Sequence, residues 1–305
     1  MQNKVTVTLK DGFVHGLIYV KELNQLWGCT RTSPDAVVMR FNPNNLVKYD
    51  RIVLSGIEKA SDILYTRDYI YVCCKEHIIQ INPETLSVTT VAKSDGALDW
   101  QSFCTDGTYL YVLGHAGSLR KYAMDTWAIE SVVEELQDID GSQYPLQNPH
   151  TIRYDVTYGH LYVTGANVPA WIAKVSHTVL VVKNVVYANY AGATDDLAMT
   201  DEYLWIGIEA FKGKILRVRK SDLMVKEIDT NIPSSRSYGT FYDGKHIWNL
   251  IPNIPGIIQR INPDTLEFFN ITLDAGEDAV NEIASDGERL FLTCWTNPAK
   301  IISLN

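Results

Sequence analysis

Residues Tyr238 to Leu266 read Tyr-Gly-Thr-Phe-Tyr-Asp-Gly-Lys-His-Ile-Trp-Asn-Leu-Ile-Pro-Asn-Ile-Pro-Gly-Ile-Ile-Gln-Arg-Ile-Asn-Pro-Asp-Thr-Leu. The alternation of apolar and polar residues predicts a strand, a turn at Asp243-Gly244, a second strand, a proline-rich loop and a third strand. A further turn begins at Asn262-Pro263, because Asn and Pro preset turn geometry. The rest of the chain repeats this plan.

Two positions of the repeat can be followed along the chain. An aromatic residue of the second strand recurs at intervals of 44, 40, 51, 43, 43 and 43 residues, as Trp27, Tyr71, Tyr111, Tyr162, Trp205, Trp248 and Phe291. A residue of the third strand recurs at intervals of 40, 41, 53, 43, 43 and 43 residues, as Arg40, Gln80, Lys121, Lys174, Arg217, Arg260 and Ser303. Both registers count seven repeats, and both place the long repeat at the same point.

The remaining parts of each repeat indicate tight turns and a fourth strand. Pairs such as Asp106-Gly107 and Asp286-Gly287 supply the positive φ angles of a tight hairpin. After each Asn-Pro turn, a short alternating segment follows. Four short antiparallel strands per repeat, without helical periodicity, predict an all-β fold: a seven-bladed β-propeller with four-stranded antiparallel blades. We expect residues 1–305 to form a single domain.

The two ends of the chain complete one blade in this prediction. The last repeat stops at Leu304-Asn305, after its third strand, and the segment Val5 to Leu9 alternates as a strand does. We therefore expect the N-terminal strand to join the last blade and close the ring, because closure removes an open sheet edge.

The repeats resemble those of YVTN-type and virginiamycin-lyase-type seven-bladed propellers. The resemblance covers the whole chain and rests on scaffold residues: the Asn-Pro-x-Thr-Leu turns, Thr108-Tyr109-Leu110-Tyr111-Val112 and Leu161-Tyr162-Val163-Thr164-Gly165. It implies the propeller fold, and it implies that lyase activity occurs among similar proteins. Virginiamycin-type lyases use a His and a Glu on late blades, whereas this chain offers Tyr238 and Asn281-Glu282 there, without a late inner-strand His.

Composition and charge limit the partners. The formal net charge of −9 opposes binding to phosphate backbones, so we expect no nucleic-acid partner and favour cationic or neutral ones. No signal peptide or transmembrane segment is seen, and no membrane partner is expected. The five cysteines lack metal-binding spacing and are predicted to be buried without disulfides. A cytoplasmic location, or assembly in a particle, is therefore expected.

The residues that open the seven innermost strands form the first candidate site, since these strand ends surround one mouth of a propeller channel. Carboxylates there would suit a hard divalent cation, calcium or magnesium, and the candidate metal ligands are Asp62, Asp195, Asp196 and Glu282. His15 and His150 occupy equivalent positions and are the candidate catalytic bases. A polar rim is also what a wet channel requires without any ligand.

Loops on the same face form the second candidate site. Prolines at Ser33-Pro34, Val168-Pro169, Ile254-Pro255 and Asn297-Pro298 stiffen the loops between second and third strands, with Phe211-Lys212-Gly213 in the fifth repeat. Exposed aromatic residues on stiff loops are typical of protein-recognition surfaces, although proline here also ends strand pairing. The candidate ligand-binding residues are Arg236, Tyr238, Asn281, Trp171, Phe211 and Trp295.

The longest departure from the repeat is Ala128 to Asn148, which we interpret as an acidic, solvated insertion. It contains Asp138-Ile139-Asp140-Gly141 but lacks the downstream Glu of an EF-hand.

Two functions of different class follow. The first is a non-enzymatic recognition or assembly module that presents one propeller face to a protein partner, in a larger particle or alone. The alternative is a cation-assisted lyase or lactonase that acts on a small molecule at the channel mouth. The sequence leaves open whether the protein is an enzyme.

Overall fold

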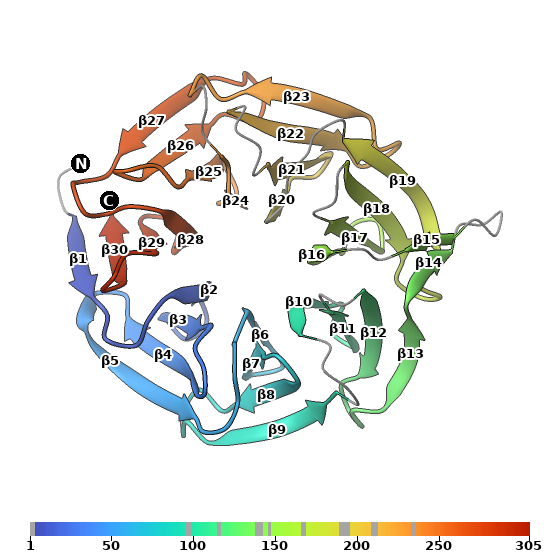
Figure 1. The fold of residues 1–305 in the computed structure, drawn as a ribbon, viewed down its shortest axis with the longest axis horizontal. Helices are drawn as coiled ribbons and strands as arrows, with labels where there is room; N and C mark the ends of the chain where they lie inside the picture. The colour runs from blue at the N-terminus through green and yellow to red at the C-terminus, as the bar shows by residue number, and fades with distance from the viewer. Residues whose placement is uncertain are drawn as a thin grey trace. The chain divides into compact units, whose positions relative to one another are not determined.

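The computed structural model describes residues 4–94, 99–114, 117–137, 143–145, 148–165, 169–188, 196–208, 213–232 and 236–305 (Figure 1). These residues form seven four-stranded antiparallel sheets and one two-stranded sheet, without a helix. The predicted fold class, an all-β seven-bladed propeller, is confirmed. The chain divides into two compact units, Met1–Ala97 with Asp243–Asn305, and Leu98–Tyr242. The expectation of one domain stays a prediction.

The first unit contains three complete blades. The first blade is β2 (Val14–Val20), β3 (Gln25–Thr30), β4 (Ala36–Asn42) and β5 (Asn45–Leu54). The second is β6 (Asp62–Thr66), β7 (Tyr69–Cys73), β8 (His77–Ile81) and β9 (Val88–Lys93). The seventh is β28 (Val280–Ser285), β29 (Leu290–Cys294), β30 (Lys300–Leu304) and β1 (Val5–Thr8). Their innermost strands β28, β2 and β6 are neighbours (Figure 1).

The second unit also contains three complete blades. The third blade is β10 (Trp100–Thr105), β11 (Tyr109–Gly114), β12 (Ser118–Ala123) and β13 (Ile129–Val133). The fourth is β16 (Pro149–Asp155), β17 (His160–Gly165), β18 (Ala170–Ser176) and β19 (Val182–Ala188). The fifth is β20 (Leu197–Met199), β21 (Tyr203–Gly207), β22 (Lys214–Arg219) and β23 (Val225–Asp229). The sixth sheet of the chain is β24 (Gly239–Tyr242), β25 (Ile247–Ile251), β26 (Ile257–Ile261) and β27 (Phe268–Thr272).

The segment Ala128 to Asn148, interpreted as a solvated insertion, contains more regular structure than expected, because it begins with β13, the fourth strand of the third blade. After β13, a two-stranded hairpin forms from β14 (Glu135–Gln137) and β15 (Gln143–Pro145). The alternation of apolar and polar residues in a three-residue strand is too short for the strand to be predicted from the sequence. The Asp138 to Gly141 segment lies outside the described residues.

The turn chemistry follows the prediction. Asp106, Asp243 and Asp286 each accept two backbone N–H groups with Oδ1, at 2.7 to 3.0 Å, and the glycine after each has a φ of 91° to 93°. Asn82 and Asn262 cap the second type of turn in the same way. The side chains thus satisfy the donors that each turn leaves unpaired.

The core lies between neighbouring sheets. One cluster joins Trp27, Val38 and Ile52 of the first blade to Ile63 and Val72 of the second. A second cluster joins the third and fourth blades, and a third joins the fourth and fifth. The five cysteines are free and buried, as predicted, and Cys29 and Cys74 pack in the first of these clusters.

The N-terminal strand joins the seventh blade, as predicted. β1 pairs with β30 from Val5 opposite Ser303 to Thr8 opposite Lys300. Leu9 is fully buried beyond the end of this strand. Lys4 forms ion pairs with Asp274, at 2.6 Å, and with the buried Glu277. The N-terminal segment is therefore held by strand pairing with β30, by burial of Leu9 and by the ion pairs of Lys4.

Deleting residues 1–10 is expected to lower the unfolding free energy by about 3 kcal/mol or more, because the deletion removes a buried leucine and the partner of a buried carboxylate. Deleting residues 1–3 is the matched control, since it keeps all of these contacts. Thermal melting of the two truncated proteins measures the difference. Equal melting temperatures would contradict this account of closure.

A buried ion pair links the fourth and fifth blades. Lys220 Nζ lies 2.7 Å from Asp155 Oδ2, and both side chains are at most 4% exposed. Asp155 also accepts the Thr157 N–H at 3.0 Å. The pair occupies the turn region next to β16 and β22.

Asp155→Asn should destabilise the protein by about 3 to 5 kcal/mol, because it leaves the Lys220 ammonium buried without a counter-charge. The double variant Asp155→Asn with Lys220→Met should recover a large part of that loss. Chemical denaturation of the single and double variants measures both effects. A single variant as stable as the wild type would refute the assignment.

Candidate functional site

β-Bulges mark the start of several innermost strands. In the pairing of β2 with β3, Val14 lies opposite Thr30 and Gly16 opposite Cys29, so His15 is the extra residue. The same irregularity occurs at Gln101, at His150 and within Asn281–Glu282. A bulged residue leaves the ladder, and its side chain is aimed away from the usual pleat. Four of the predicted rim positions are thus displaced by one shared backbone feature.

In the first unit, an aromatic cluster surrounds His15. The centre of the Trp295 ring lies 4.9 Å from that of the His15 imidazole and 6.1 Å from that of the Phe13 ring. Trp295 Nε1 donates to the Val14 carbonyl at 3.3 Å, which holds the indole against the start of β2. We call Phe13, His15, Trp295 and Ile254 the Trp295 surface.

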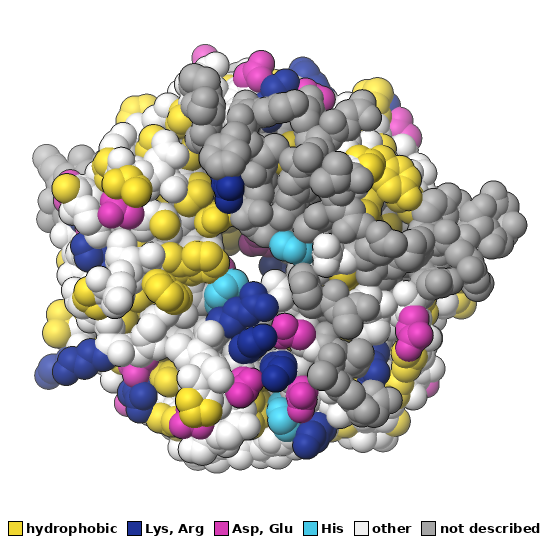
Figure 2. Space-filling view, in the orientation of Figure 1, with side chains coloured by type: hydrophobic (Ala, Val, Ile, Leu, Met, Phe, Trp, Pro, Cys, Tyr) yellow, Lys and Arg dark blue, Asp and Glu magenta, His cyan; other side chains and the backbone are white. Residues whose placement is uncertain are grey.

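Ile254 joins this surface through a chain of backbone hydrogen bonds. The Ala279 N–H donates to Asn253 O at 3.2 Å, and the Trp295 N–H donates to Ala279 O at 3.0 Å. Ile254 is 86% exposed and Phe13 is 45% exposed, while Trp295 is half-buried. Figure 2 shows hydrophobic side chains gathered beside a histidine over the β28 and β2 part of the molecule, with Lys and Arg side chains next to that histidine.

The environment of His15 favours the neutral imidazole. Burial, and to a smaller extent the positive charge of Arg31, lower the pKa of His15 to about 4. A neutral ring packs against Trp295 without the cost of desolvating a charge. At neutral pH, His15 therefore belongs to the apolar part of the surface.

The predicted carboxylates of the first unit lie on either side of β2. Asp62 opens β6, and a Cβ at Gly16 would lie 3.3 Å from the Asp62 Cα, so the glycine permits close approach of the two strands. Glu282 accepts the Asn281 side-chain amide at 2.9 Å. Both carboxylates raise the pKa of Cys29, although burial of that thiol is the main cause.

In the second unit, an arginine engages one of the predicted metal ligands. Arg153 Nη2 donates to Asp196 Oδ1 at 2.9 Å, and Arg153 Nη1 donates to Ser102 Oγ at 3.1 Å. The Asp196 N–H donates to Tyr238 O at 3.3 Å. Asp196, a candidate metal ligand, is therefore already paired with a cation. Arg153 was missed because nothing in the sequence indicates a partner in another blade.

The remaining predicted residues are placed as follows. Trp171 is 6% exposed and packs on Gly165, where an added Cβ would collide with the indole, so it is not the exposed aromatic that was expected. His150 and Arg236 are half-buried. Asp195 and Phe211 lie outside the described residues. The catalytic, ligand-binding and metal roles stay predictions.

A divalent-cation cage is not assembled in the described part of the chain. Within it, no three His, Cys, Asp or Glu side chains come close enough to hold a metal ion. Calcium sites commonly combine several carboxylates with carbonyl oxygens, so a cluster of acidic side chains is their usual mark. We therefore derive no chemical step through a cation.

The fold is shared with solved propellers. A catalytically inactive virginiamycin B lyase from Staphylococcus aureus with quinupristin matches with a TM-score of 0.76 and 12% identity, covering 99% of both chains. The Pan2 WD40 domain of Neurospora crassa matches with a TM-score of 0.75 and 8% identity, covering 98% of this chain and 93% of that one. A chain of the Mitotic Checkpoint Complex matches with a TM-score of 0.77 and 10% identity, covering 98% and 92%.

These identities show the fold alone, which is that of seven-bladed β-propellers. No protein-family profile and no curated protein matches the chain by sequence. The described part of the chain contains no helix long and apolar enough to cross a membrane.

The lowered pKa of His15 predicts a pH dependence of stability. Because the unfolded chain has the ordinary pKa of about 6.5, it binds the proton more strongly than the folded state does. Stability due to this residue is complete above pH 6.5 and is lost as the pH falls toward 4, by at most about 1.4 kcal/mol per pH unit.

His15→Gln should remove this pH dependence. Between pH 6.5 and 4, the unfolding free energy of the wild type should therefore fall more steeply than that of the variant. Denaturant melts at several pH values measure the difference, and NMR titration of the imidazole gives its pKa directly. A midpoint near 6.5 would show that the ring is not held neutral by its surroundings.

Proposed function

We propose that the protein is a non-enzymatic recognition module and that the Trp295 surface binds a protein partner. The observation that carries the proposal is an exposed phenylalanine, Phe13, that packs against the half-buried Trp295, near the exposed Ile254 of a loop whose backbone is hydrogen-bonded toward Trp295. A few buried anchors, tryptophan among the commonest, carry most of the binding energy of a protein interface, and truncating such an anchor costs about 2 kcal/mol or more. The neutral His15 extends the apolar area at physiological pH.

The support for this surface is stiff, which lowers the entropy lost on binding. Trp295 is held by its backbone hydrogen bond to Ala279 and its indole hydrogen bond to Val14. Arg31, next to His15, places a cation at the edge of the apolar area. The overall charge of −9 favours a partner that is neutral or cationic as a whole.

The fold neighbours are compatible with this function but do not decide it. One is a WD40 domain and one comes from the Mitotic Checkpoint Complex, while another is a lyase. The lyase-type alternative needs a cation or an oriented base. Asp196 is already paired with Arg153, and His15 packs against an indole instead of a carboxylate.

A photo-crosslinking amino acid at position 13 should form a covalent adduct with a specific protein in the cells that make this chain. The matched control is position 269, because Phe269 is also an exposed phenylalanine, at 55%, on the outer strand β27. With the crosslinked protein purified, Ile254→Ser should weaken its binding at least tenfold. Equal crosslinking from both positions, or none, would refute the recognition surface.

The same preparation tests the alternative. A rise in melting temperature with saturating calcium or magnesium that Asp196→Asn abolishes would favour the cation-assisted enzyme instead. We expect no such rise, because Arg153 occupies the carboxylate.

A further inference from the structure

The turn between β16 and β17 exposes two large apolar side chains in the second unit. Val156 is 82% exposed and Tyr158 is 49% exposed. Tyr158 stands four residues before the recurring aromatic Tyr162, where the third, sixth and seventh blades have the glycine of an Asp-Gly turn. The fourth blade therefore departs from the repeat by placing an aromatic ring where three other blades have no side chain.

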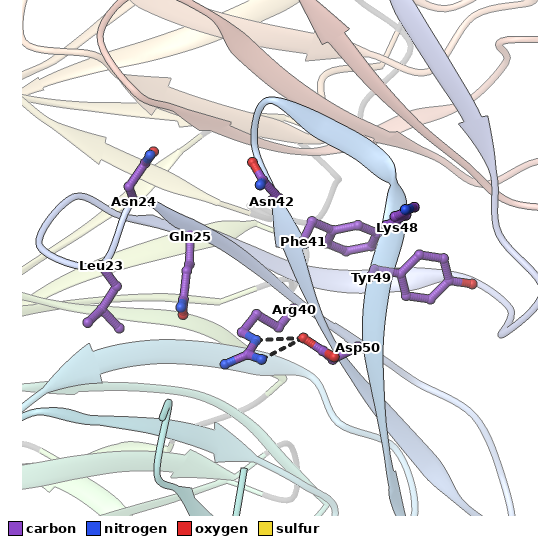
Figure 3. Close-up of a pocket in the computed structure, with 9 residues that line it drawn as sticks. All are labelled: Leu23, Asn24, Gln25, Arg40, Phe41, Asn42, Lys48, Tyr49 and Asp50. Atoms are coloured by element: carbon purple, nitrogen blue, oxygen red, sulfur yellow. Dashed lines mark hydrogen bonds and ion pairs between the residues drawn. The ribbon is translucent and has the colours of Figure 1, made fainter. Parts of the chain in front are cut away.

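The first blade has a similar turn but no such surface. Leu23 stands at the position of Tyr158, four residues before Trp27, and it is half-buried against the core. After Asn45 the outer strand β5 bulges, which brings Lys48 to the lining of a surface cavity of about 470 Å³ (Figure 3). The polar side chains of this cavity point in different directions. At this position of the repeat, an aromatic residue occurs only in the fourth blade.

Neighbouring turns pack against the turn that carries Tyr158. His177 Nδ1 donates to Gly159 O, and an added Cβ at Gly159 would lie 3.3 Å from the His177 ring. This contact holds the turn between β18 and β19, with its 63% exposed Val179, against the turn between β16 and β17. In the fifth blade, Lys220 Nζ lies 5.7 Å from the centre of the Tyr158 ring. The exposed ring is therefore in contact with two blades.

Met224 extends this surface on the fifth blade. It is 57% exposed, and its N–H donates to Asp222 Oδ1 at 3.1 Å. Asn184 Nδ2 of the fourth blade donates to Asp222 O at 3.2 Å, so this turn is also held against the fourth blade. We call the four exposed apolar residues of these turns the Tyr158 surface: Val156, Tyr158, Val179 and Met224.

The exposed charge beside the Tyr158 surface is mostly negative. Asp201 and Glu202 are both exposed, and the Lys220 N–H donates to Glu202 O at 2.9 Å, which places their turn next to the turn that carries Lys220. Arg219 is an exposed cation there, and it pairs with Asp222 at 2.5 Å. Three exposed carboxylates therefore accompany one exposed guanidinium.

The lysines of these blades are directed into the protein. Lys121 Nζ donates to Thr178 O at 3.2 Å. Lys174 Nζ donates to Lys220 O at 3.0 Å, and Lys220 Nζ pairs with the buried Asp155. A ligand at the Tyr158 surface would therefore contact apolar side chains and carboxylates more readily than ammonium groups.

We propose that the Tyr158 surface binds a basic segment of a protein partner. Apolar side chains of the segment contact Val156 and Tyr158, and its Lys or Arg side chains lie beside Asp201 and Glu202. Tyrosine is enriched at interfaces because its ring supplies a large contact area at a low entropic cost. Complementary charge steers a basic segment to such a surface and disfavours acidic ones. A second copy of this chain is disfavoured as the occupant, because two copies that each carry a net charge of −9 repel one another.

The Tyr158 surface lies in the second unit and shares no residue with the Trp295 surface, so the two surfaces are tested independently. The probe is a short peptide of alternating lysine and leucine, titrated while backbone amide NMR signals of the protein are recorded. Saturable shifts are expected at the four residues of the Tyr158 surface, and the affinity should fall as the salt concentration rises. Shifts confined to other residues, or shifts without saturation, would overturn the site.

Two further peptides separate the parts of the proposal. A peptide of glutamate and leucine lacks the cations, and a peptide of lysine and serine lacks the apolar side chains, so each should bind at least tenfold more weakly. Equal affinity for the first would overturn the basic character of the partner, and equal affinity for the second would overturn the apolar contact. Shifts at the same residues on raising the protein concentration without peptide would identify a second copy as the occupant and would also overturn the proposal.

Tyr158→Ala, and the double variant Asp201→Asn with Glu202→Gln, should each weaken binding of the lysine–leucine peptide at least fivefold. All three side chains are exposed, so the fold is retained. The matched control is Glu84→Gln with Asp264→Asn, which removes the same charge from exposed turns of the second and sixth blades. An equal loss in this control would reveal general charge attraction and refute the site, as would an unchanged affinity in the Tyr158→Ala protein.

Discussion

The contact that recurs through this structure is a residue pair set directly across the second and third strands of a blade. The seven pairs are Trp27 with Arg40, Tyr71 with Gln80, Tyr111 with Lys121, Tyr162 with Lys174, Trp205 with Arg217, Trp248 with Arg260 and Phe291 with Ser303. Cross-strand partners lie about 5 Å apart, so an aromatic ring shields the stem of the side chain beside it. The aromatic residue that recurs in the second strand and the residue that recurs in the third strand are therefore the two partners of one cross-strand contact.

This pair also positions the next blade. Lys174 Nζ and the Tyr162 hydroxyl both donate to Lys220 O, at 3.0 and 3.4 Å, and Arg40 donates to Pro83 O. A tight turn leaves such carbonyls without a ladder partner, and a hydrogen bond from a charged group is worth about 1.5 to 3 kcal/mol. In the seventh blade the corresponding residue is Ser303, which lies opposite Val5 of the closing strand. There Arg289 stacks over Phe291 and donates to the Pro43 carbonyl at 2.8 Å instead.

The fold was predictable from the sequence because its rules are local and repeated. In an Asp-Gly turn or an Asn-Pro turn, the Asp or Asn side chain accepts the backbone N–H groups of the same turn. Each turn can therefore be predicted from its own few residues, without information on distant ones. The candidate site was predictable only as a set of strand ends. The bulge at His15 depends on the pairing partner of β2, and the Arg153 to Asp196 ion pair joins residues of different blades. Trp171 shows the same limit, because whether its ring is exposed depends on the missing side chain of Gly165.

In a repeated scaffold, the positions that depart from the repeat are the ones where side chains can contact a ligand. Where every copy obeys the same cross-strand rule, polar groups are engaged by their own or the next blade, as Arg40 and Lys174 are. Groups remain available for a ligand where a bulge or an altered turn removes the usual partner. The bulge at His15 turns a strand residue onto an indole, and the bulge after Asn45 brings Lys48 to the lining of a surface cavity. These two irregularities lie at opposite ends of one blade, so changes at one end can be made without disturbing the ladder that holds the other.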